Sequence, residues 1–215
     1  MSPRGRFITL EGGDGAGKST QIARLAASLR AGGLEVVETR EPGGAPGAEA
    51  IRSLLLGAND GQRFEPLTEA LLMFAARAEH LAHTIRPALE RGAWVVCDRF
   101  VHSTIAYQGY GLGLDLKLIQ ELRRLVVGAD EPDLTLILDL PVAVGLARAE
   151  ARGADAATRY ERLGPAFHER LRAGFLALAQ AEPQRCVVID ANIDPGAVAS
   201  RIETAIAERF RAGLL

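Results

Sequence analysis

The sequence predicts an α/β fold of three layers, in which a five-stranded parallel sheet lies between flanking helices. Five short apolar runs rich in β-branched residues recur along the chain. The intervals between them are long enough to hold the crossover helices that parallel strands require. The first run leads directly into a glycine-rich loop and then a segment of helical period, which is the order found in phosphate-binding folds.

The strands and helices alternate along the chain. The predicted strands are Phe7–Leu10, Leu34–Val37, Trp94–Cys97, Leu134–Leu138 and Val187–Ile189. The intervening segments show the apolar period of helices. The predicted helices are Lys18–Ala31, Gly47–Leu56, Leu67–Arg91, Leu116–Val127, Val142–Arg152, Tyr160–Ala181 and Pro195–Phe210. At about 150 residues per domain, we expect one domain over residues 1–215, or one domain with an inserted lid.

Composition excludes several classes of protein. The 215 residues are 48% hydrophobic and 24% charged, which is unlike disordered, collagen-like or coiled-coil chains. With 25 Lys+Arg against 27 Asp+Glu the net charge is -2, so we expect neither a nucleic-acid nor a membrane partner. Cys97 and Cys186 lie in or beside apolar runs, which argues against a disulfide framework. No signal peptide or membrane-length apolar run is evident, and we expect a cytoplasmic protein.

The strongest motif is a phosphate-binding loop between the first strand and the first helix. Residues 12–19 match the pattern GxxxxGKS. Glycines allow inward-pointing N–H groups, Lys18 can reach the terminal phosphates, and the Ser19 hydroxyl can bind Mg²⁺. The residues predicted to bind ATP here are Gly12, Gly13, Asp14, Gly15, Ala16, Gly17, Lys18, Ser19 and Thr20. A functionless glycine turn is the alternative, and the correct flanking elements disfavour it.

A second magnesium ligand is expected at the end of a strand. Three apolar runs end in aspartate, at Asp98, Asp139 and Asp190, and ligands gather at the carboxyl ends of parallel strands. We select Asp98 because Arg99 follows it and offers a bidentate fork for a phosphate. The alternative is a local ion pair between Asp98 and Arg99.

A second anion site is indicated by side chains suited to a phosphorylated acceptor. Arg40 follows the second strand, while Phe74 and Arg77 are one turn apart on a helix. Residues 98–108 add charge, hydroxyls, an aromatic ring and an amide. Each alone has a structural explanation, in the core or on the surface, but together with the phosphate loop they favour a nucleotide acceptor.

These motifs resemble those of the bacterial thymidylate kinases over nearly the whole chain. The matching segments are FITLEGGDGAGKST at 7–20, TREPGG at 39–44, LLMFAARAEH at 71–80, DRFVHSTIAYQG at 98–109, PDLTLILDLP at 132–141 and the arginine-rich stretch 148–172. The DRxxxSTxAYQG segment is the specific part, because many unrelated activities share the phosphate loop. The resemblance implies the P-loop nucleoside monophosphate kinase fold.

The resemblance also implies an activity and a set of site residues. It implies a homodimer that uses Mg²⁺ and transfers the γ-phosphoryl group of ATP to thymidine monophosphate (dTMP), as a step of dTTP synthesis. The residues it implies for dTMP binding are Asp14, Arg40, Phe74, Arg77, Arg99, Ser103, Thr104, Tyr107 and Gln108. Arg40 and Arg99 would hold the acceptor phosphate, and Arg77 and Thr104 would hydrogen-bond the thymine edge. Lys18 and Arg99 would also be catalytic, and Tyr107 would disfavour a ribonucleotide.

An arginine-rich lid over about 148–165 is expected to complete the donor site. Family members place an extra catalytic arginine either in the phosphate loop or in the lid, and this chain has Gly15 in the loop. The resemblance therefore assigns Arg152 as the catalytic arginine and Arg148 as the residue that stacks on adenine. The chain departs from many members where Met73 holds the usual place of the base-stacking phenylalanine and where Leu112 replaces an arginine.

Two other functions compete with this interpretation. A kinase for another nucleoside monophosphate fits the loop equally, and only Arg77, the pair Ser103 and Thr104, and Gln108 favour thymine. A nucleotide-dependent switch or regulatory ATPase would leave the 98–108 cluster unexplained. A guanine-specific GTPase is disfavoured because no NKxD motif occurs.

Overall fold

Five parallel strands form one sheet in the order β2-β3-β1-β4-β5. The computed structural model describes residues 4–56, 64–151 and 159–210. The strands are β1 (Phe7–Glu11), β2 (Val36–Arg40), β3 (Trp94–Asp98), β4 (Leu134–Asp139) and β5 (Cys186–Asp190). β1 lies at the centre and every pairing is parallel, so all the strands end at one edge.

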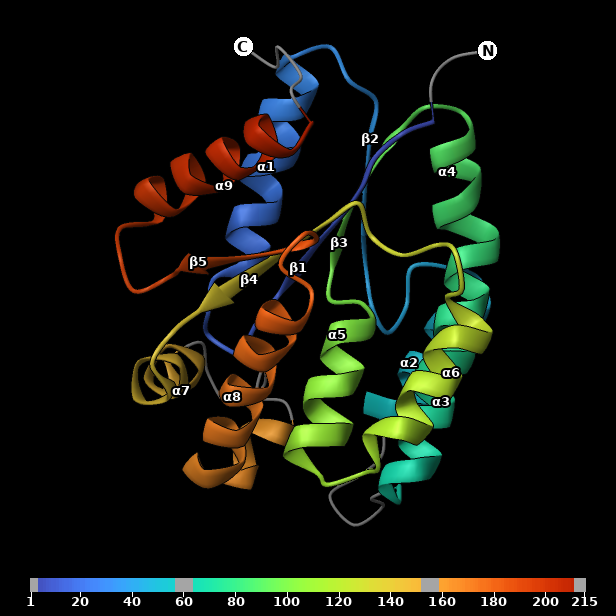
Figure 1. Cartoon of the computed structure of the whole chain (residues 1–215), viewed down its shortest axis with the longest axis vertical. Coiled ribbons are helices and arrows are strands. Elements are labelled where there is room, and N and C mark those ends of the chain that lie inside the picture. The colour runs from blue at the N-terminus through green and yellow to red at the C-terminus, as the bar shows by residue number, and fades with distance from the viewer. Residues whose placement is uncertain (1–3, 57–63, 152–158, 211–215) are drawn as a thin grey trace.

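Helices connect the strands and cover the sheet (Figure 1). They are α1 (Lys18–Ala31), α2 (Pro46–Leu56), α3 (Pro66–His80), α4 (Arg86–Glu90), α5 (Val101–Thr104), α6 (Leu116–Val126), α7 (Val142–Glu150), α8 (Pro165–Ala181) and α9 (Pro195–Phe210). π-helical stretches at Leu81–Ile85 and Ile105–Gly111 continue α3 and α5, and a 3₁₀ turn at Arg159–Leu163 precedes α8. Within the described ranges, no helix is long and apolar enough to span a membrane.

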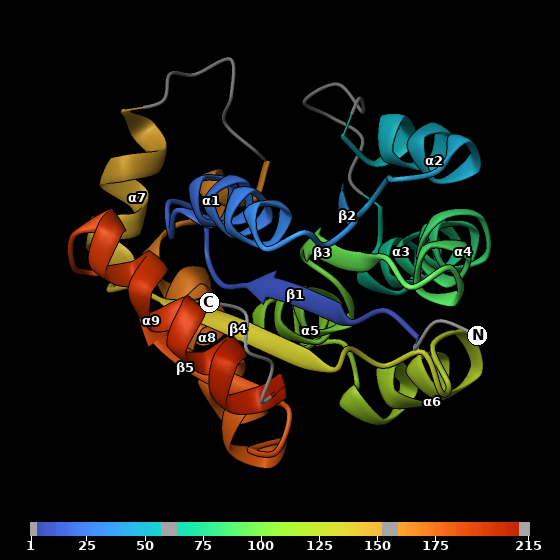
Figure 2. The ribbon, with the colours of Figure 1, turned by 90° about the horizontal axis from the view of Figure 1, so that it is seen from above.

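Alternate residues of each strand enter two separate cores. Ile8 and Leu136 pack with Leu25 of α1 and Ile202 of α9 on one face. Phe7 and its neighbours on the other face pack against α3, α4, α5 and α8. Figure 2 shows α1 and α5 on opposite sides of β1. The predicted three-layer α/β fold with a five-stranded parallel sheet is therefore confirmed.

Most predicted boundaries lie within one or two residues of the structure, and three differences are larger. The second strand was expected at 34–37 and lies at Val36–Arg40, because pairing with β3 extends it through polar residues on the sheet edge. No helix was predicted over residues 101–111, where α5 and its π-helical continuation lie. The helix expected from residue 160 begins at Pro165, after Gly164 at φ 76° interrupts the helical path.

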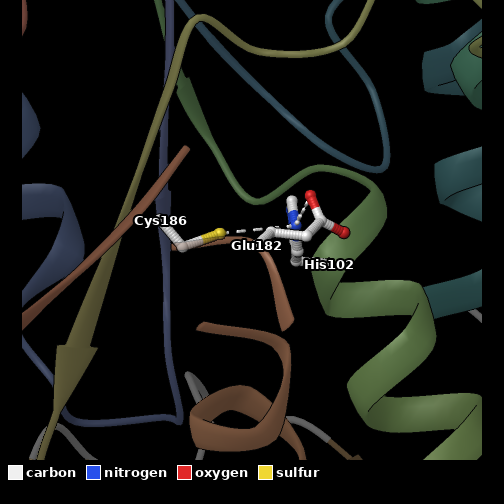
Figure 3. A group of neighbouring side chains, drawn as sticks. All are labelled: His102, Glu182 and Cys186. Carbon is white, nitrogen blue, oxygen red and sulfur yellow. Dashed lines mark hydrogen bonds and ion pairs between the residues drawn. The ribbon is translucent and has the colours of Figure 1, made fainter. Parts of the chain in front are cut away.

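A buried polar cluster ties α5 to β5. The imidazole Nε2 of His102 lies 3.4 Å from Oε2 of Glu182 and 3.7 Å from Sγ of Cys186 (Figure 3). Although three potential metal ligands meet here, Glu182 is already bound by Arg123 through two contacts of 2.7 and 3.1 Å. Arg185 lies 3.5 Å from the same carboxylate. Two guanidinium groups oppose a further cation, so we interpret the cluster as a structural anchor.

Candidate active site

The phosphate loop crosses from β1 to α1 through three glycines with positive φ. They are Gly12 at 130°, Gly15 at 76° and Gly17 at 86°. A Cβ on Gly12 would lie 2.4 Å from the carbonyl oxygen of Leu138, and one on Gly15 would lie 2.2 Å from that of Gly145 in α7. Any side chain at these two positions would collide with backbone, which explains why the loop requires glycine there.

Lys18 is buried at the start of α1 and points back into the loop. Its Nζ donates to the carbonyl oxygens of Gly12 at 3.1 Å and Gly13 at 2.9 Å. Burial, together with the nearby charge of Arg99, lowers the pKa of Lys18 to about 8. The charged form of Lys18 is therefore destabilised when no nucleotide is bound, and an anionic phosphate beside it would stabilise that charged form.

Arg99 does not pair with the adjacent carboxylate of Asp98 but extends to the phosphate loop. It has a left-handed backbone conformation, with φ 65°, which is unusual for a residue other than glycine. Its Nη2 donates to Asp14 at 2.8 Å, and its Nη1 donates to the Gly12 carbonyl at 3.0 Å and to Ser103 Oγ at 3.2 Å. Such strain is typical of a functional position.

Asp98 ends β3 beside the start of α1 and has the character of a metal ligand. Its Oδ1 is buried and has no hydrogen-bond partner within the described part of the chain. The same hollow is lined by Ser19, whose hydroxyl suits Mg²⁺. The other strand-end aspartates have partners: Asp139 binds Arg172 at 2.7 Å, and Asp190 lies 3.7 Å from Arg201. The residues at Asp98 and Ser19 therefore fit a magnesium ion.

Arg40 lines this same hollow rather than the pocket described next. It is exposed, and its Nη2 lies 3.2 Å from Oε1 of Glu49. Glu49 also accepts the backbone N–H of Gly44 at 2.8 Å, which lowers the pKa of its carboxyl group. Because Arg40 does not line the pocket described next, its role toward the acceptor phosphate stays a prediction.

A second pocket opens between the phosphate loop, α3 and the 101–111 helical segment. Its lining includes Asp14, Arg77, Arg99, Thr104, Tyr107 and Gln108. Six residues predicted for the acceptor thus meet around one space. The predicted Ser103 also lines it, with its hydroxyl 2.5 Å from Oε2 of the buried Glu11.

Arg77 is 1% exposed and is the principal polar group of this pocket. Its Nε donates to Glu41 at 2.7 Å and its Nη2 to Thr104 Oγ1 at 2.9 Å. Its Nη1 is buried and unpartnered among the residues that the structure describes. A ligand carbonyl in the pocket would satisfy it.

The two candidates for the base face occupy different places. Met73 lines the pocket. Phe74 is buried behind it, with its ring centroid 4.8 Å from the guanidinium carbon of Arg77, and Phe100 lies 5.1 Å away on the same guanidinium. Phe74 therefore supports Arg77, and the stacking of either Met73 or Phe74 on a base stays a prediction.

Tyr107 and Gln108 connect the pocket to Tyr160, in the later part of the predicted lid. Tyr107 donates its hydroxyl hydrogen to Asp14 at 3.2 Å, and its ring contacts that of Tyr160 at 4.8 Å. Gln108 Nε2 donates to Glu69 at 2.5 Å, and the Tyr160 hydroxyl donates to the same carboxylate. Tyr160 was absent from the predicted site, yet it lines the pocket.

The predicted lid lies partly outside the described residues. Arg152, the predicted catalytic arginine, is among the residues that are not described. Arg148 is described: it is exposed on α7, and its Nη1 lies 3.3 Å from the carbonyl oxygen of Ala191, just after β5. Thr20 is exposed in the first turn of α1. Their roles toward ATP stay predictions.

Sequence reasoning missed four polar residues that support the site. Glu11, Glu41 and His80 are buried, and Glu69 is 1% exposed. Burial raises the pKa of Glu11, which accepts the backbone N–H of Phe100 at 2.8 Å. Each lies inside a quoted motif or a helix, but only the folded chain brings their partners from elsewhere in the sequence.

Comparisons with known proteins agree on one family. The sequence model described as "Thymidylate kinase" matches residues 10–202. The chain is 58% identical over 208 residues to a thymidylate kinase of Caulobacter vibrioides, covering 96% of this chain and 98% of that protein. It is 52% identical over 207 residues to one of Thermomicrobium roseum, covering 96% and 97%. The crystal structure of thymidylate kinase from Ehrlichia chaffeensis superposes with a TM-score of 0.76 at 36% identity, covering 95% of this chain and all of that one.

Proposed function

The chain belongs to the thymidylate kinase family, and from this we propose how its described residues serve the reaction. The enzyme transfers the γ-phosphoryl group of ATP to dTMP, which yields dTDP and ADP. In this transfer the dTMP phosphate oxygen forms a bond to the γ-phosphorus as the bond to the β-phosphate oxygen breaks. The protein contributes mainly position and charge, because phosphoryl transfer needs little covalent help.

The donor phosphates are assigned to the phosphate loop. Lys18 leaves its two carbonyl partners in the loop for the phosphate oxygens of ATP, and the loop N–H groups at the start of α1 add favourable dipoles. Its charge stabilises the oxygens of the transferred group as negative charge shifts onto the leaving phosphate.

Magnesium is assigned to Asp98 and Ser19. The support is the unpartnered Oδ1 of Asp98, which shares a hollow with Ser19 among the described residues. When bound, the ion would neutralise charge on the donor phosphates. Oδ1 of Asp98 would coordinate the ion directly or accept a hydrogen bond from a water molecule bound to it.

The single observation that supports thymine as the acceptor base is the unpartnered Nη1 of Arg77 in a pocket next to the phosphate loop. A base with a carbonyl at this edge satisfies this donor, while one with an amino group opposes it. Arg99 reaches from the same pocket to Asp14 and the loop, so we assign it to the acceptor phosphate and the reacting oxygens. Tyr107 lies against Asp14, where we assign the deoxyribose.

Three further parts of the proposal concern the whole enzyme. We assign Arg152 as the lid arginine that meets the transferred phosphoryl group, since Gly15 has no room for a side chain. We also propose that the enzyme works as a homodimer in the cytoplasm, within dTTP synthesis. Exposed leucines on α2, α3 and α6, at Leu54, Leu71 and Leu125, are compatible with an interface there.

A panel of acceptors tests the proposed specificity. ADP release would be measured with ATP and Mg²⁺ and each of dTMP, dCMP, AMP and GMP in turn. We expect dTMP to be preferred by about a hundredfold or more over dCMP and AMP, since the amino groups of cytosine and adenine leave the buried Arg77 unpaired. Guanine also carries a carbonyl, so GMP tests whether the pocket excludes a purine ring as well. Equal rates with any of the other three would overturn the assignment of the pocket to thymine.

A further inference from the structure

His80 is a completely buried histidine outside the acceptor pocket, with a defined partner on each ring nitrogen. It ends α3 and is 0% exposed. Nδ1 lies 3.0 Å from Oε1 of Glu41, and Nε2 lies 2.7 Å from Oγ1 of Thr39. Because a carboxylate only accepts hydrogen bonds, Nδ1 carries the hydrogen and donates to Glu41.

The other oxygen of the Glu41 carboxylate holds Arg77. Oε2 accepts from Arg77 Nε at 2.7 Å, and the Arg77–Glu41 pair is almost fully buried, at 2% and 4% side-chain exposure. One carboxylate is therefore divided between His80 and Arg77. Thr39, His80, Glu41 and Arg77 form a continuous chain of hydrogen bonds. It ends at Arg77, which lines the pocket and whose Nη1 has no partner among the described residues.

This division of the carboxylate controls how the guanidinium faces. Arginine pairs with carboxylates most strongly through two parallel N–H donors. While His80 occupies Oε1, Glu41 takes only one N–H of Arg77, and Nη2 stays on Thr104. With Oε1 unoccupied, a second N–H of Arg77 would move to Glu41, and the buried oxygen would be satisfied at the expense of the contact with Thr104.

We propose that His80 is a positioning residue for the acceptor base, which acts through Glu41 to hold Nη1 of Arg77 toward the pocket. The proposal rests on the proposed role of Arg77 in binding the base. His80 itself is not among the residues that line the acceptor pocket. Its effect is on the geometry of one donor, so it belongs to the recognition of the base carbonyl and not to phosphoryl transfer.

The surrounding backbone makes room for this arrangement. Gly44 has φ 82°, and a Cβ there would lie 2.4 Å from both His80 Nε2 and Thr39 Oγ1. A glycine therefore permits the close contact between the two side chains. The guanidinium at the other end is enclosed by the rings of Phe74 and Phe100, so a small change in its hydrogen bonds redirects it rather than releasing it into solvent.

Three substitutions separate the two ring nitrogens. His80→Asn places an amide N–H near the position of Nδ1, His80→Gln places one near Nε2, and His80→Leu removes both. We expect the KM for dTMP to rise about tenfold in His80→Leu, with kcat within about twofold, because a misaimed binding group costs affinity more than turnover. The KM of His80→Asn for dTMP should be closer to the wild-type value than the KM of His80→Gln.

The ratio of dTMP to dCMP efficiency distinguishes positioning from general support of the fold. Thymine presents a carbonyl where cytosine presents an amino group, so only dTMP gains from a correctly aimed Nη1. We expect kcat/KM for dTMP relative to dCMP to fall about tenfold in His80→Leu. A merely structural defect would lower both efficiencies together. His83→Asn is the matched control, because His83 lies one turn further on and is 61% exposed.

The outcomes separate this inference from the proposed function. An unchanged dTMP to dCMP ratio in His80→Leu, with the ratio lost in Arg77→Met, would overturn the role of His80 alone. An unchanged ratio in Arg77→Met would overturn the role of Arg77 and with it this inference. If His80→Leu does not fold, Thr39→Val and His80→Asn provide the comparison. Thr39→Val should raise the KM for dTMP about threefold over the wild type, and His80→Asn should have a lower KM for dTMP than His80→Gln. A KM and a dTMP to dCMP ratio unchanged from the wild type in Thr39→Val, or equal in His80→Asn and His80→Gln, would contradict the proposal.

Discussion

The guanidinium of Arg99 donates to the carboxylate of Asp14 at 2.8 Å, although Asp98 is its neighbour in sequence. The left-handed backbone at Arg99 turns its side chain toward the phosphate loop. Asp14 has a lowered pKa because, although burial opposes ionisation, the charges of Arg99 and Lys18 outweigh it. The pair therefore fixes an arginine between the proposed donor and acceptor sites and leaves Oδ1 of Asp98 without a partner among the described residues, as the proposed metal site requires.

Arg99→Lys should lower kcat/KM for dTMP by about a hundredfold or more, because an ammonium cannot reproduce the planar donors that reach Asp14, Gly12 and Ser103 together. Steady-state kinetics checks this. Arg86→Lys is the control, since Arg86 forms an ion pair with Asp130 and is 44% exposed. Near-normal kinetics in Arg99→Lys would show that any positive charge suffices there.

ATP binding should take up a proton through Lys18. Because the pKa of the free Lys18 is about 8, about half of the ammonium groups are neutral at pH 8, and phosphate binding favours the charged form. Calorimetry of ATP binding in buffers of different ionisation enthalpy measures this uptake. We expect about half a proton per site at pH 8 and much less at pH 6. Lys18→Met should abolish it, whereas uptake that persists in this variant would assign the proton to another group.

The lowered pKa of Lys18 should also make the free energy of unfolding depend on pH. In the folded free enzyme Lys18 loses its proton near pH 8, whereas in the unfolded chain it does so near 10.5. Between these values the unfolded state binds more protons, so this group makes the folded state relatively more stable as the pH rises. Urea unfolding should accordingly show that Lys18→Met is more stable than the wild type at pH 7, by a margin that narrows toward pH 10.

Asp98→Asn should lower turnover by about a hundredfold and raise the Mg²⁺ concentration needed for half-maximal rate, because an amide is a weaker ligand than a carboxylate. The fold should persist, since Oδ1 has no partner to lose among the described residues. Asp190→Asn is a matched control at the end of β5, where the carboxylate is 53% exposed. An unchanged magnesium dependence in Asp98→Asn would place the ion elsewhere.

The phosphate loop and the sheet were predictable because their signals are local. Glycine spacing identified the loop, and apolar runs identified five strands. The supporting residues were not predictable, because the partners of His80 and Glu69 come from segments distant in the chain. The aim of Arg99 depends on a backbone conformation that arginine rarely adopts, so its sequence neighbour Asp98 was an equally reasonable partner.

The cluster around Glu182 should make stability depend on acid pH. Burial alone would raise the pKa of Glu182, but hydrogen bonds from His102 and Arg123 outweigh it and hold the pKa far below its usual value of 4.5. A depressed carboxyl pKa contributes stability above the unfolded value, and this contribution is lost as the pH falls toward the folded one. The free energy of unfolding of Glu182→Gln should be about 3 kcal/mol lower than that of the wild type at pH 7. This difference in unfolding free energy should shrink below pH 4.5.

Urea unfolding at pH 7, 5 and 3.5 tests this dependence. Glu121→Gln is the control, because Glu121 is 68% exposed in its pair with Arg124 and should matter little at any pH. A difference between Glu182→Gln and the wild type that stays constant across the series would indicate lost packing rather than a lost charge.

Tyr160→Phe should weaken dTMP binding without affecting ATP. The Tyr160 hydroxyl and the amide of Gln108 meet on the carboxylate of Glu69, while the tyrosine ring packs on Tyr107. Removing the hydroxyl keeps the ring contact but loosens the group that orients Gln108 in the pocket, so the KM for dTMP should rise about fivefold with little change in melting temperature. Tyr110→Phe is the control, because Tyr110 lies in the same helical segment as Tyr107 and Gln108 but does not line the pocket. Because Tyr160 lies within the predicted lid, an equal rise in the KM for ATP would instead show that the hydroxyl positions the lid over the donor, and the link to the acceptor base would be wrong.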